Sequence, residues 1–485
     1  MRNLLLLFIA FLFFQFSLLA QAPDTSWTRK FGGGMGRSVQ QTSDGGYIIT
    51  GSTKFLSAGD NDLWLIKTDS LGNILWTKTY GGSESDVGYS IQQTTDGGYI
   101  ITGITQSFGA GENDIWLIKT NNSGDTLWTK TIGGSNNDVG NSVQQTNDGG
   151  YIIAGSMYSS VNNGYDVWLI KTDSLGDTLW TKTYGGGEFD FGYSTQQTED
   201  GGYIITGNTY SYGFGDLNVW LIKTNDSGDT LWTKWYGGLS VDGGFSVRQT
   251  TDGGYIIAGY TYLSSAGGGD VYLIKTDAFG DTLWTKTLGG SYPEMETGFS
   301  VQQTTDGGYI ITGDVQYPSW QSALLLIKTN AIGDTLWTKK VGEMSNGNTG
   351  YDVKQTIDGG YIVTGETNYY INLFYTDLYL VKIGSDATSA VPVTTTYPFD
   401  FSLQQNFPNP FNSSTKIKYL VPKSSNLVIK VLDILGKEIE TLVNEEKPPG
   451  TYEITWYADN LPSGVYFYQL RVGSFIETKK MVLLK

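Results

Sequence analysis

Acidic side chains recur at matching positions along this chain and are its main candidates for chemistry. One set stands just before the third strand-like run of most repeats. A second set lies in the connection that leads from one repeat to the next. Carboxylate oxygens are the ligands that calcium prefers, so these groups predict a ring of carboxylates that holds Ca²⁺. The candidate ligands are Asp62, Asp86, Asp114, Asp138, Asp166, Asp190, Asp242 and Asp270, with Asp377 and Glu296 at equivalent places.

A structural role is the alternative for the same carboxylates. An aspartate at the start of a strand commonly accepts backbone N–H bonds and so caps a turn. One aspartate per repeat also lacks the dense oxygen spacing of a calcium loop. Asn218 and Ala323 occupy the position in two of the repeats. Both interpretations stay open from the sequence, and no cofactor other than calcium is expected.

Composition excludes several kinds of site. The 485 residues include no cysteine and no histidine, which rules out disulfides, thiolate sites, a Ser-His-Asp triad and histidine-ligated zinc. Carboxylate, lysine, tyrosine, serine and threonine chemistry remains. The net charge of −17 repels a phosphate backbone, so nucleic acid is not an expected partner.

Aromatic residues gather in the connections between the second and third strand-like runs of each repeat. Amphipathic rings beside carboxylates suit a sugar or a protein surface. The alternative is that the rings anchor their own loops. The candidate ligand-binding residues are Tyr210, Tyr212, Tyr260, Tyr262, Tyr317, Trp320 and Tyr369.

The element that must position these residues is a repeat built on Asp-Gly-Gly-Tyr. This motif begins at Asp44, Asp96, Asp148, Asp200, Asp252, Asp306 and Asp358, which are 52 or 54 residues apart. Asp-Gly between apolar runs predicts a hairpin, because glycine adopts positive φ without steric cost. A period of this length indicates one supersecondary unit that cannot bury its faces alone.

Each repeat contains four strand-like runs rich in Tyr, Ile, Thr and Trp. In one repeat they are residues 88–94, 99–105, 114–120 and 126–130. The chain after residue 22 starts with a fourth-type run around Trp27, and the last repeat lacks one after residues 377–382. Pairing these two runs closes a ring and protects two sheet edges. The sequence therefore predicts a seven-bladed β-propeller with four-stranded blades over residues 23–384.

Loop lengths favour one face of this propeller for binding. In a propeller, the loop that leads from the fourth strand of one repeat to the first strand of the next lies on the same face as the loop between the second and third strands. All the variation in loop length among the repeats falls in these two loops. Variable loops on a rigid scaffold usually hold binding residues. The tryptophan of the fourth run recurs at a fixed place and is predicted to pack between blades.

Residues 1–22 have the pattern of a secretory signal peptide, with Arg2, an apolar run from Leu4 to Leu19 and a small-residue cleavage site ending at Ala22. A membrane anchor is the alternative, but basic residues do not follow the run. No transmembrane segment is expected in the mature chain.

Residues 385–400 are small, polar and proline-containing, and are predicted to be a linker. Residues 401–485 then have new short strand-like runs at 414–421, 426–432, 450–456, 464–472 and 475–484, typical of a small β-sandwich.

Several motifs of this last segment occur in a familiar order. Leu403-Gln404-Gln405-Asn406-Phe407-Pro408-Asn409-Pro410 opens it, Leu461-Pro462-Ser463-Gly464-Val465-Tyr466 follows, and Lys479-Lys480-Met481-Val482-Leu483-Leu484 ends it. The segment resembles the type A C-terminal sorting domain of the type IX secretion system. The resemblance implies export across both membranes by that machinery, with release or attachment at the outer-membrane surface. The whole chain resembles secreted Asp-Gly-Gly-Tyr repeat proteins that have such a domain.

These features together predict a secreted or cell-surface binding or adhesion module, with a glycan or a surface protein as ligand. One alternative is an extracellular glycan-processing enzyme, which needs two carboxylates about 5–5.5 Å apart if it retains configuration. Another is a purely structural surface component. The sixth repeat departs most from the others, with Pro293-Glu294-Met295-Glu296 inserted, so an asymmetric site is expected there first.

Overall fold

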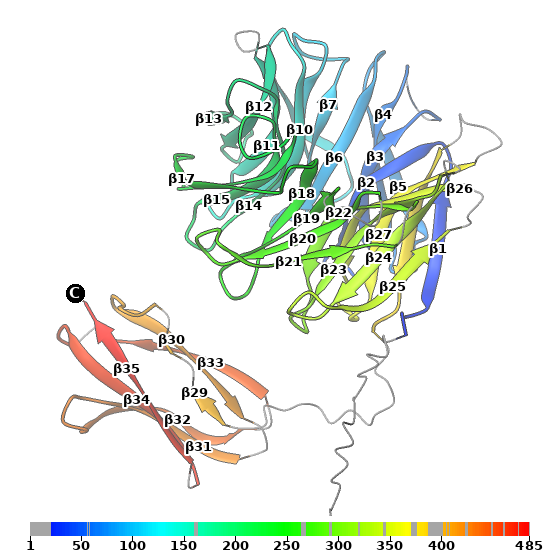
Figure 1. The fold of residues 1–485 in the computed structure, drawn as a ribbon. Helices are drawn as coiled ribbons and strands as arrows, with labels where there is room; N and C mark the ends of the chain where they lie inside the picture. The colour runs from blue at the N-terminus through cyan, green and yellow to red at the C-terminus, as the bar shows by residue number, and fades with distance from the viewer. Residues whose placement is uncertain are drawn as a thin grey trace, which may run out of the picture. The chain divides into compact units, whose positions relative to one another are not determined.

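The computed structural model describes residues 21–485 except 56, 58, 160–162, 263–267, 291–292, 319–320, 343–345, 370–375, 387–400, 404, 407, 422–424, 448–449, 459–460, 474 and 485. Every helix or strand element within these residues is a β-strand (Figure 1). The chain forms two compact units, Met1–Ala387 and Thr388–Lys485.

The N-terminal unit is a series of antiparallel four-stranded sheets, one for each repeat, numbered here as units one to seven. The first strands are β2 (Gly34–Gln41), β6 (Asp86–Gln93), β10 (Asp138–Gln145), β14 (Asp190–Gln197), β18 (Asp242–Gln249), β22 (Met295–Gln303) and β26 (Asn346–Gln355). The second strands are β3 (Tyr47–Thr53), β7 (Tyr99–Thr105), β11 (Tyr151–Ser159), β15 (Tyr203–Thr209), β19 (Tyr255–Thr261), β23 (Tyr309–Gln316) and β27 (Tyr361–Tyr369).

The third strands are β4 (Asp62–Thr68), β8 (Asp114–Thr120), β12 (Gly164–Thr172), β16 (Asn218–Thr224), β20 (Asp270–Thr276), β24 (Ser322–Thr329) and β28 (Thr376–Ile383). The fourth strands are β5 (Ile74–Tyr80), β9 (Thr126–Ile132), β13 (Thr178–Tyr184), β17 (Thr230–Tyr236), β21 (Thr282–Leu288) and β25 (Thr335–Val341). Units six and seven belong to one larger sheet, joined by a parallel bridge between Ser322 and Gly347.

The fourth strand beside β28 comes from the other end of the chain. β1 (Thr25–Phe31) pairs antiparallel with β28, and Trp27 lies opposite Lys382. The predicted pairing of the N-terminal run with residues 377–382 is therefore observed. The first strands also contact one another in sequence order, and β26 contacts β2.

The sheets stack face to face, and this explains which strands are buried. Residues of β4 and β8 are buried along their whole length, as expected for strands covered on both faces. Each fourth-strand tryptophan packs against the motif tyrosine of the next unit. Trp76 and Tyr99 have ring centroids 6.2 Å apart, and Trp27 and Tyr47 are 5.9 Å apart. The tryptophan thus packs between sheets, as the sequence predicts.

The Asp-Gly-Gly-Tyr motif forms the predicted turn between the first and second strands. Gly97 has a φ of 82°, in the region that glycine adopts without strain. The Asp96 carboxylate accepts bonds from the Gly98 N–H at 3.0 Å and the Thr94 hydroxyl at 2.5 Å. The buried Lys119 ammonium donates to the same carboxylate at 2.9 Å. The motif therefore ties the turn to the third strand.

The C-terminal unit has two sheets around one core. One sheet contains β29 (Ser402–Leu403), β30 (Ser414–Val421) and β33 (Gly450–Tyr457). The other contains β31 (Ser425–Leu432), β32 (Glu438–Lys447), β34 (Gly464–Val472) and β35 (Phe475–Leu483). Trp456, Tyr468 and Met481 are buried together between them. The strand β32 is not predicted from the sequence, because its largely exposed residues have no alternating apolar pattern.

Residues 1–20 lie outside the described part of the chain, and so does most of the predicted signal peptide. Ala22 is described and packs against the apolar core between units six and seven. In the parts of the chain that the structure describes, no helix has the length and apolar content required to cross a bilayer.

Candidate functional site

The predicted acidic ring consists largely of buried carboxylates. Asp86, Asp190 and Asp242 have no exposed surface, and Asp62, Asp114, Asp138 and Asp270 are also buried, while Asp166 is partly exposed. One oxygen of each first-strand carboxylate caps the preceding loop. Asp86 accepts from the Gly82 N–H at 3.0 Å, and Asp242 accepts from the Gly238 N–H at 2.8 Å. These bonds fit the capping role considered from the sequence.

Carboxylates from neighbouring units face each other across a glycine. A Cβ atom at Gly133 would lie 2.0 Å from Asp114 Oδ1 and 2.8 Å from Asp138 Oδ2. Burial raises the pKa of Asp138, and the Asp114 charge raises it further, against hydrogen bonds that lower it. Burial and then the Asp190 charge raise the pKa of Asp166. The loop glycines are required because this space belongs to the paired carboxylates.

Among the described residues, no group of three or more acidic side chains is placed to hold a metal ion. Asp86 Oδ1, Asp138 Oδ1 and Asp242 Oδ1 are buried without a hydrogen-bond partner. Calcium binding at the carboxylates named above stays a prediction.

Three of the predicted aromatic residues join a larger set of contacting rings. Tyr260 lies 5.8 Å from Tyr262 and 5.7 Å from Phe245, measured between ring centroids. Tyr210 lies 6.5 Å from Phe189. Continuous ring contacts connect what we call the aromatic cluster: Tyr158, Tyr165, Phe189, Phe191, Tyr193, Tyr210, Phe245, Tyr260, Tyr262, Phe299 and Tyr351.

Two other predicted aromatic residues, Tyr212 and Tyr317, have separate contacts. Tyr212 packs on Trp220 at 5.3 Å and its hydroxyl donates to the Gly185 carbonyl at 2.9 Å, which anchors its loop. The Lys340 ammonium lies 5.2 Å from the centre of the Tyr317 ring. Tyr369 ends β27, and Trp320 lies outside the described residues.

Sequence reasoning missed the part of the aromatic cluster that lies on the first strands. Tyr193, Phe245, Phe299 and Tyr351 each follow a glycine that recurs in every repeat, as do Arg37, Tyr89 and Asn141. The backbone register shifts at this residue in every unit, for example between Gly244 and Ser246, which is typical of a β-bulge. When the repeats are aligned on this glycine, the residue that follows it varies in type from repeat to repeat. This variation is the sequence signal that could have identified the position.

The aromatic cluster is exposed at some rings and buried at others. Phe189, Tyr210 and Tyr262 expose 39%, 46% and 42% of their surface. Burial raises the pKa of Tyr193 and of Tyr260 to about 12, so both hydroxyls stay protonated at neutral pH. The cluster therefore offers an accessible edge on a rigid, packed base.

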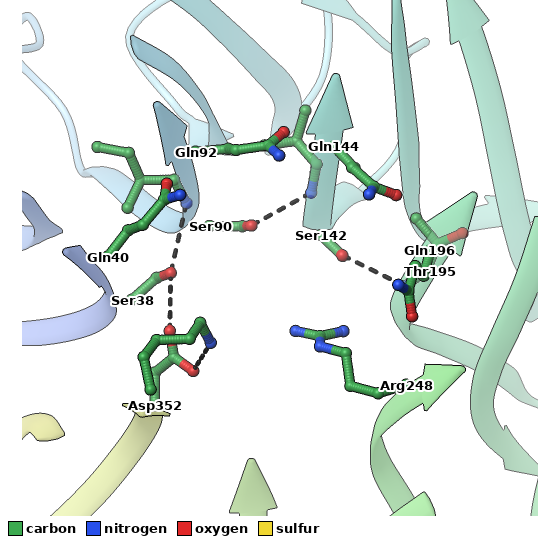
Figure 2. A pocket seen from close by; sticks show the side chains of 13 residues that line it. Ser38, Gln40, Ser90, Gln92, Ser142, Gln144, Thr195, Gln196, Arg248 and Asp352 are labelled. Atoms are coloured by element: carbon green, nitrogen blue, oxygen red, sulfur yellow. Dashed lines mark hydrogen bonds and ion pairs between the residues drawn. The ribbon is translucent and has the colours of Figure 1, made fainter. Parts of the chain in front are cut away.

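Deeper on the first strands, rings of polar side chains join each unit to the next. The Ser90 hydroxyl accepts from the Val143 N–H at 3.2 Å, and the Ser142 hydroxyl accepts from the Thr195 N–H at 3.2 Å (Figure 2). The same bond recurs between the other units and ends with Asp352 accepting from the Val39 N–H at 3.1 Å.

A glutamine two residues further on makes a second set of such bonds. Gln92 Oε1 accepts from the Gln145 N–H at 2.5 Å, and five units have this bond. Arg248 and Lys354 occupy the position in units five and seven. Members of both sets line a cavity of about 220 Å³, into which the Arg248 side chain extends (Figure 2).

The sixth unit has a separate cavity of about 380 Å³ lined by Glu294, Glu296 and Lys340. The Lys340 ammonium lies 3.0 Å from the Glu294 carboxylate. Burial raises the pKa of Glu296, with smaller contributions from Asp270 and Glu294, against a hydrogen bond from Gly290. The inserted residues thus contribute to a cavity in the sixth unit, and a functional site there stays a prediction.

Comparisons with known proteins give one family match and several distant likenesses. A curated relative, the regulatory protein FlaEY of Caulobacter vibrioides, is 24% identical over 193 residues, which are 34% of this chain and 20% of that protein. The chain therefore spans a fifth of the length of that relative.

Three solved structures with a similar fold are each below 25% identical to this chain. PorZ, described as a bacterial surface component of the type IX secretion system of Porphyromonas gingivalis, is 12% identical with a TM-score of 0.39, covering 91% of this chain and 58% of that one. The β-propeller domain of the Trilobed protease from Pyrococcus furiosus is 9% identical with a TM-score of 0.42, covering 72% and 93%. A fungal alcohol oxidase in complex with copper is 10% identical with a TM-score of 0.46, covering 96% and 100%.

Residues 405–484 match the family model of the secretion system C-terminal sorting domain. These residues include nearly all of the motifs noted in the sequence, and they form most of the two-sheet C-terminal unit. The C-terminal unit is a type IX sorting domain, and the protein is secreted to the cell surface or the extracellular space.

Proposed function

We propose that the N-terminal unit is a closed seven-bladed β-propeller that binds carbohydrate at the cell surface, as an adhesion or capture module without catalytic activity. Hydrogen bonds between successive units support closure. The Gln93 side chain accepts from the Ser43 N–H at 3.0 Å, and equivalent bonds recur up to Gln41, which accepts from the Ile357 N–H at 2.9 Å. The last bond joins unit seven to unit one, as does the strand pair of β1 and β28.

The observation that supports binding is the aromatic cluster. Rings contribute a large apolar area at low entropic cost, and tyrosine adds a hydroxyl for hydrogen bonding. Tyr210 and Tyr262 present exposed rings, and both adjoin rings that are held in place by other rings. A sugar has apolar C–H faces and polar edges, so such a surface suits stacking with hydrogen bonds at the rim.

A glycan array probed with the mature chain tests this proposal. We expect saturable binding that the triple variant Tyr210→Ser, Tyr260→Ser, Tyr262→Ser weakens at least ~10-fold, the size of effect expected for desolvated aromatic contacts. Phe279→Ser is the matched control, since Phe279 is 70% exposed in a turn between third and fourth strands. Absence of any glycan binding by the wild-type chain would contradict the proposal.

The thermal melt of each variant separates binding from folding. If the triple variant loses cooperative melting, the rings anchor loops rather than bind ligand. If Phe279→Ser weakens binding equally, the face has been assigned incorrectly. If the wild-type chain retains a host-cell protein that the triple variant does not retain, the ligand is a protein surface and not a glycan.

A further inference from the structure

A second polar compartment lies on the first strands, separate from the exposed rings of the aromatic cluster. Each first strand runs from the variable connection toward the Asp-Gly-Gly-Tyr turn, so Ser38 and Gln40 lie further toward that turn than Arg37. Four such strands, together with Arg248, Asp352 and Lys354, line the cavity of about 220 Å³.

Two cations interrupt an otherwise uniform ring in this cavity. Glutamine occupies the position in five repeats, where its side-chain oxygen accepts the backbone N–H of the next unit. Arginine and lysine have donors only. At Arg248 and Lys354 the bond cannot form, so the Gln303 and Gln41 N–H groups have no such acceptor from the preceding unit. Each replacement therefore removes an acceptor and adds a positive charge.

One carboxylate accompanies the two cations, and its oxygens are already engaged. Asp352 accepts from the Ser38 hydroxyl at 3.1 Å, the Ser300 hydroxyl at 2.9 Å and the Lys354 ammonium at 2.5 Å. Lys354 is thus partly neutralised within the cavity. Arg248 is not, because it has no ion pair with a carboxylate among the described residues.

The hydrogen bonds of Arg248 leave part of its guanidinium available. Its Nη1 donates to the Val247 carbonyl at 2.8 Å and to the Ser194 hydroxyl at 3.3 Å. No acceptor among the described residues pairs with Nη2. The side chain extends into the cavity opposite Asp352 (Figure 2). A planar guanidinium fork held in this way matches the two oxygens of a carboxylate, phosphate or sulfate.

Burial makes these charges costly without a counter-ion. It lowers the pKa of Arg248, although the Asp352 charge opposes the effect. It also lowers the pKa of Lys354, where the Asp352 charge opposes and the Arg248 charge adds to the effect. The two cations repel each other, so an anion between them relieves both burial and repulsion.

We propose that this cavity is a binding site for one small oxoanion, with Arg248 and Lys354 as the charged ligands and the serine and glutamine side chains as neutral hydrogen-bond partners. The shared chemistry is a carboxylate, phosphate or sulfate group on a small molecule. The positive charge in the cavity contrasts with the net charge of −17 for the whole chain. It therefore comes from Arg248 and Lys354 and not from a generally basic surface.

Isothermal titration calorimetry of the mature chain tests the site with three probes: glucuronate, inorganic phosphate and glucose. We expect one site per chain for at least one of the two anions and none for glucose. Binding by glucuronate alone identifies a carboxylate ligand, and binding by phosphate alone identifies a phosphate ligand. No saturable heat with either anion at millimolar concentration would overturn the proposal.

The repeat itself supplies the matched variant. Arg248→Gln with Lys354→Gln restores the glutamine found in five units, so the variant is expected to fold and to gain the missing bonds to the next unit. Anion affinity should fall at least ~10-fold, as expected when charge-assisted hydrogen bonds are lost, while the thermal midpoint without ligand stays equal or rises. Lys182→Gln with Lys234→Gln is the control, because it removes the same charge from exposed fourth-strand lysines.

Two controls separate binding in this cavity from a general response to charge. Equal loss of affinity in the Lys182 and Lys234 variant would mean that the anion responds to overall charge, and the proposal would be wrong. The triple variant of Tyr210, Tyr260 and Tyr262 should bind the anion as the wild-type chain does. Failure of glycan binding and failure of anion binding are therefore separate results.

Discussion

At the scale of single residues, a buried lysine is the most repeated polar feature of the N-terminal unit. Lys328 has no exposed surface, and its ammonium donates to the Asp306 carboxylate at 2.8 Å and to the Thr329 carbonyl at 2.9 Å. We call this ion pair between a third-strand lysine and the motif aspartate the clasp. It also occurs with Lys67, Lys119, Lys171, Lys223, Lys275 and Lys382. A buried charge without its partner is strongly unfavourable, so the aspartate of the motif is required by the lysine as well as by the turn.

The clasp predicts loss of stability in acid. Burial raises the pKa of Asp148, but bonds from Thr146 and Lys171 outweigh it and lower this pKa from 3.8 to about 2. The pKa values of Asp44 and Asp96 are also about 2. A folded-state pKa below the unfolded value stabilises the fold above pH of about 4 and loses this effect as pH falls toward about 2. We expect the urea midpoint of the mature chain to fall over this range.

A single substitution isolates one of these carboxylates. Asp148→Asn should be less stable than the wild-type chain at pH of about 6, and the difference should shrink as pH falls to about 2, where about half of the wild-type carboxylate is protonated in the folded state. The check is the unfolding free energy of both proteins at each pH. A difference that is independent of pH would show that the aspartate acts through its shape and not through its charge.

The carboxylates between neighbouring units have pKa shifts in the opposite direction, and their effect on stability has the opposite pH dependence. Burial raises the pKa of Asp242 against hydrogen bonds from Thr261 and Gly238. A raised folded-state pKa means that protonation favours the fold, so this group adds stability as pH falls through its folded-state value toward its unfolded value. Mild acid therefore relieves these sites before stronger acid disrupts the clasps.

At the scale of elements, β1 joins the first and last parts of the repeat region. It supplies the fourth strand beside β28, and its Trp27 packs on Tyr47 of unit one. Without β1, the edge of β28 has unpaired backbone groups, which promote association with other chains. The strand therefore joins the two ends of the repeat region both by hydrogen bonds and by packing.

Deletion of residues 23–31 should produce soluble oligomers or aggregates, because it exposes this edge. Size-exclusion chromatography with light scattering measures the result against the mature chain. Trp27→Ala keeps the backbone pairing and removes the ring, so it should stay monomeric and lose roughly 2–4 kcal/mol of unfolding free energy, less than a fully buried tryptophan. A deletion variant that stays monomeric and equally stable would contradict the structural role of β1.

The sequence predicts the strands well where a local pattern determines them. Tyr99–Thr105 and Asp114–Thr120 are strands with the predicted ends, since glycine turns and β-branched residues define both. The strand Glu438–Lys447 has no such pattern, because it is held by its pairing with β31 and not by burial of its own side chains.

The site was less predictable, because it depends on which repeats become neighbours. The sequence indicates Tyr260 and Tyr262 as candidate ligand-binding residues in a loop, and their binding role stays a prediction. Tyr260 lies instead in the strand β19, and local sequence does not reveal that Phe245 packs against it. Tyr212 has the same sequence signature and instead packs on Trp220. Contacts between residues about 50 positions apart, such as Ser142 with Thr195, require the stacked arrangement of the sheets.

At the scale of the whole molecule, the chain divides into two compact units. The N-terminal unit holds the aromatic cluster and the proposed oxoanion cavity, and residues 405–484 match the secretion sorting domain. The N-terminal unit ends with its own polar anchor. Asp386 accepts from Trp337 Nε1 at 2.7 Å and from the Tyr361 hydroxyl at 2.6 Å. A chain that ends at this residue keeps every strand and every described ring of bonds of the N-terminal unit.

We therefore expect a chain truncated after Asp386 to fold and to stay in the periplasm of a host with type IX secretion, because it lacks the sorting domain. Cell fractionation with immunoblotting measures its location, and limited proteolysis of the retained protein measures its folding. The complementary control joins residues 387–485 to an unrelated periplasmic reporter, which should then reach the outside of the cell. Truncated protein outside the cell at wild-type levels would refute the need for the sorting domain. A truncated chain that is degraded in the periplasm would instead show that the N-terminal unit requires the C-terminal unit to fold.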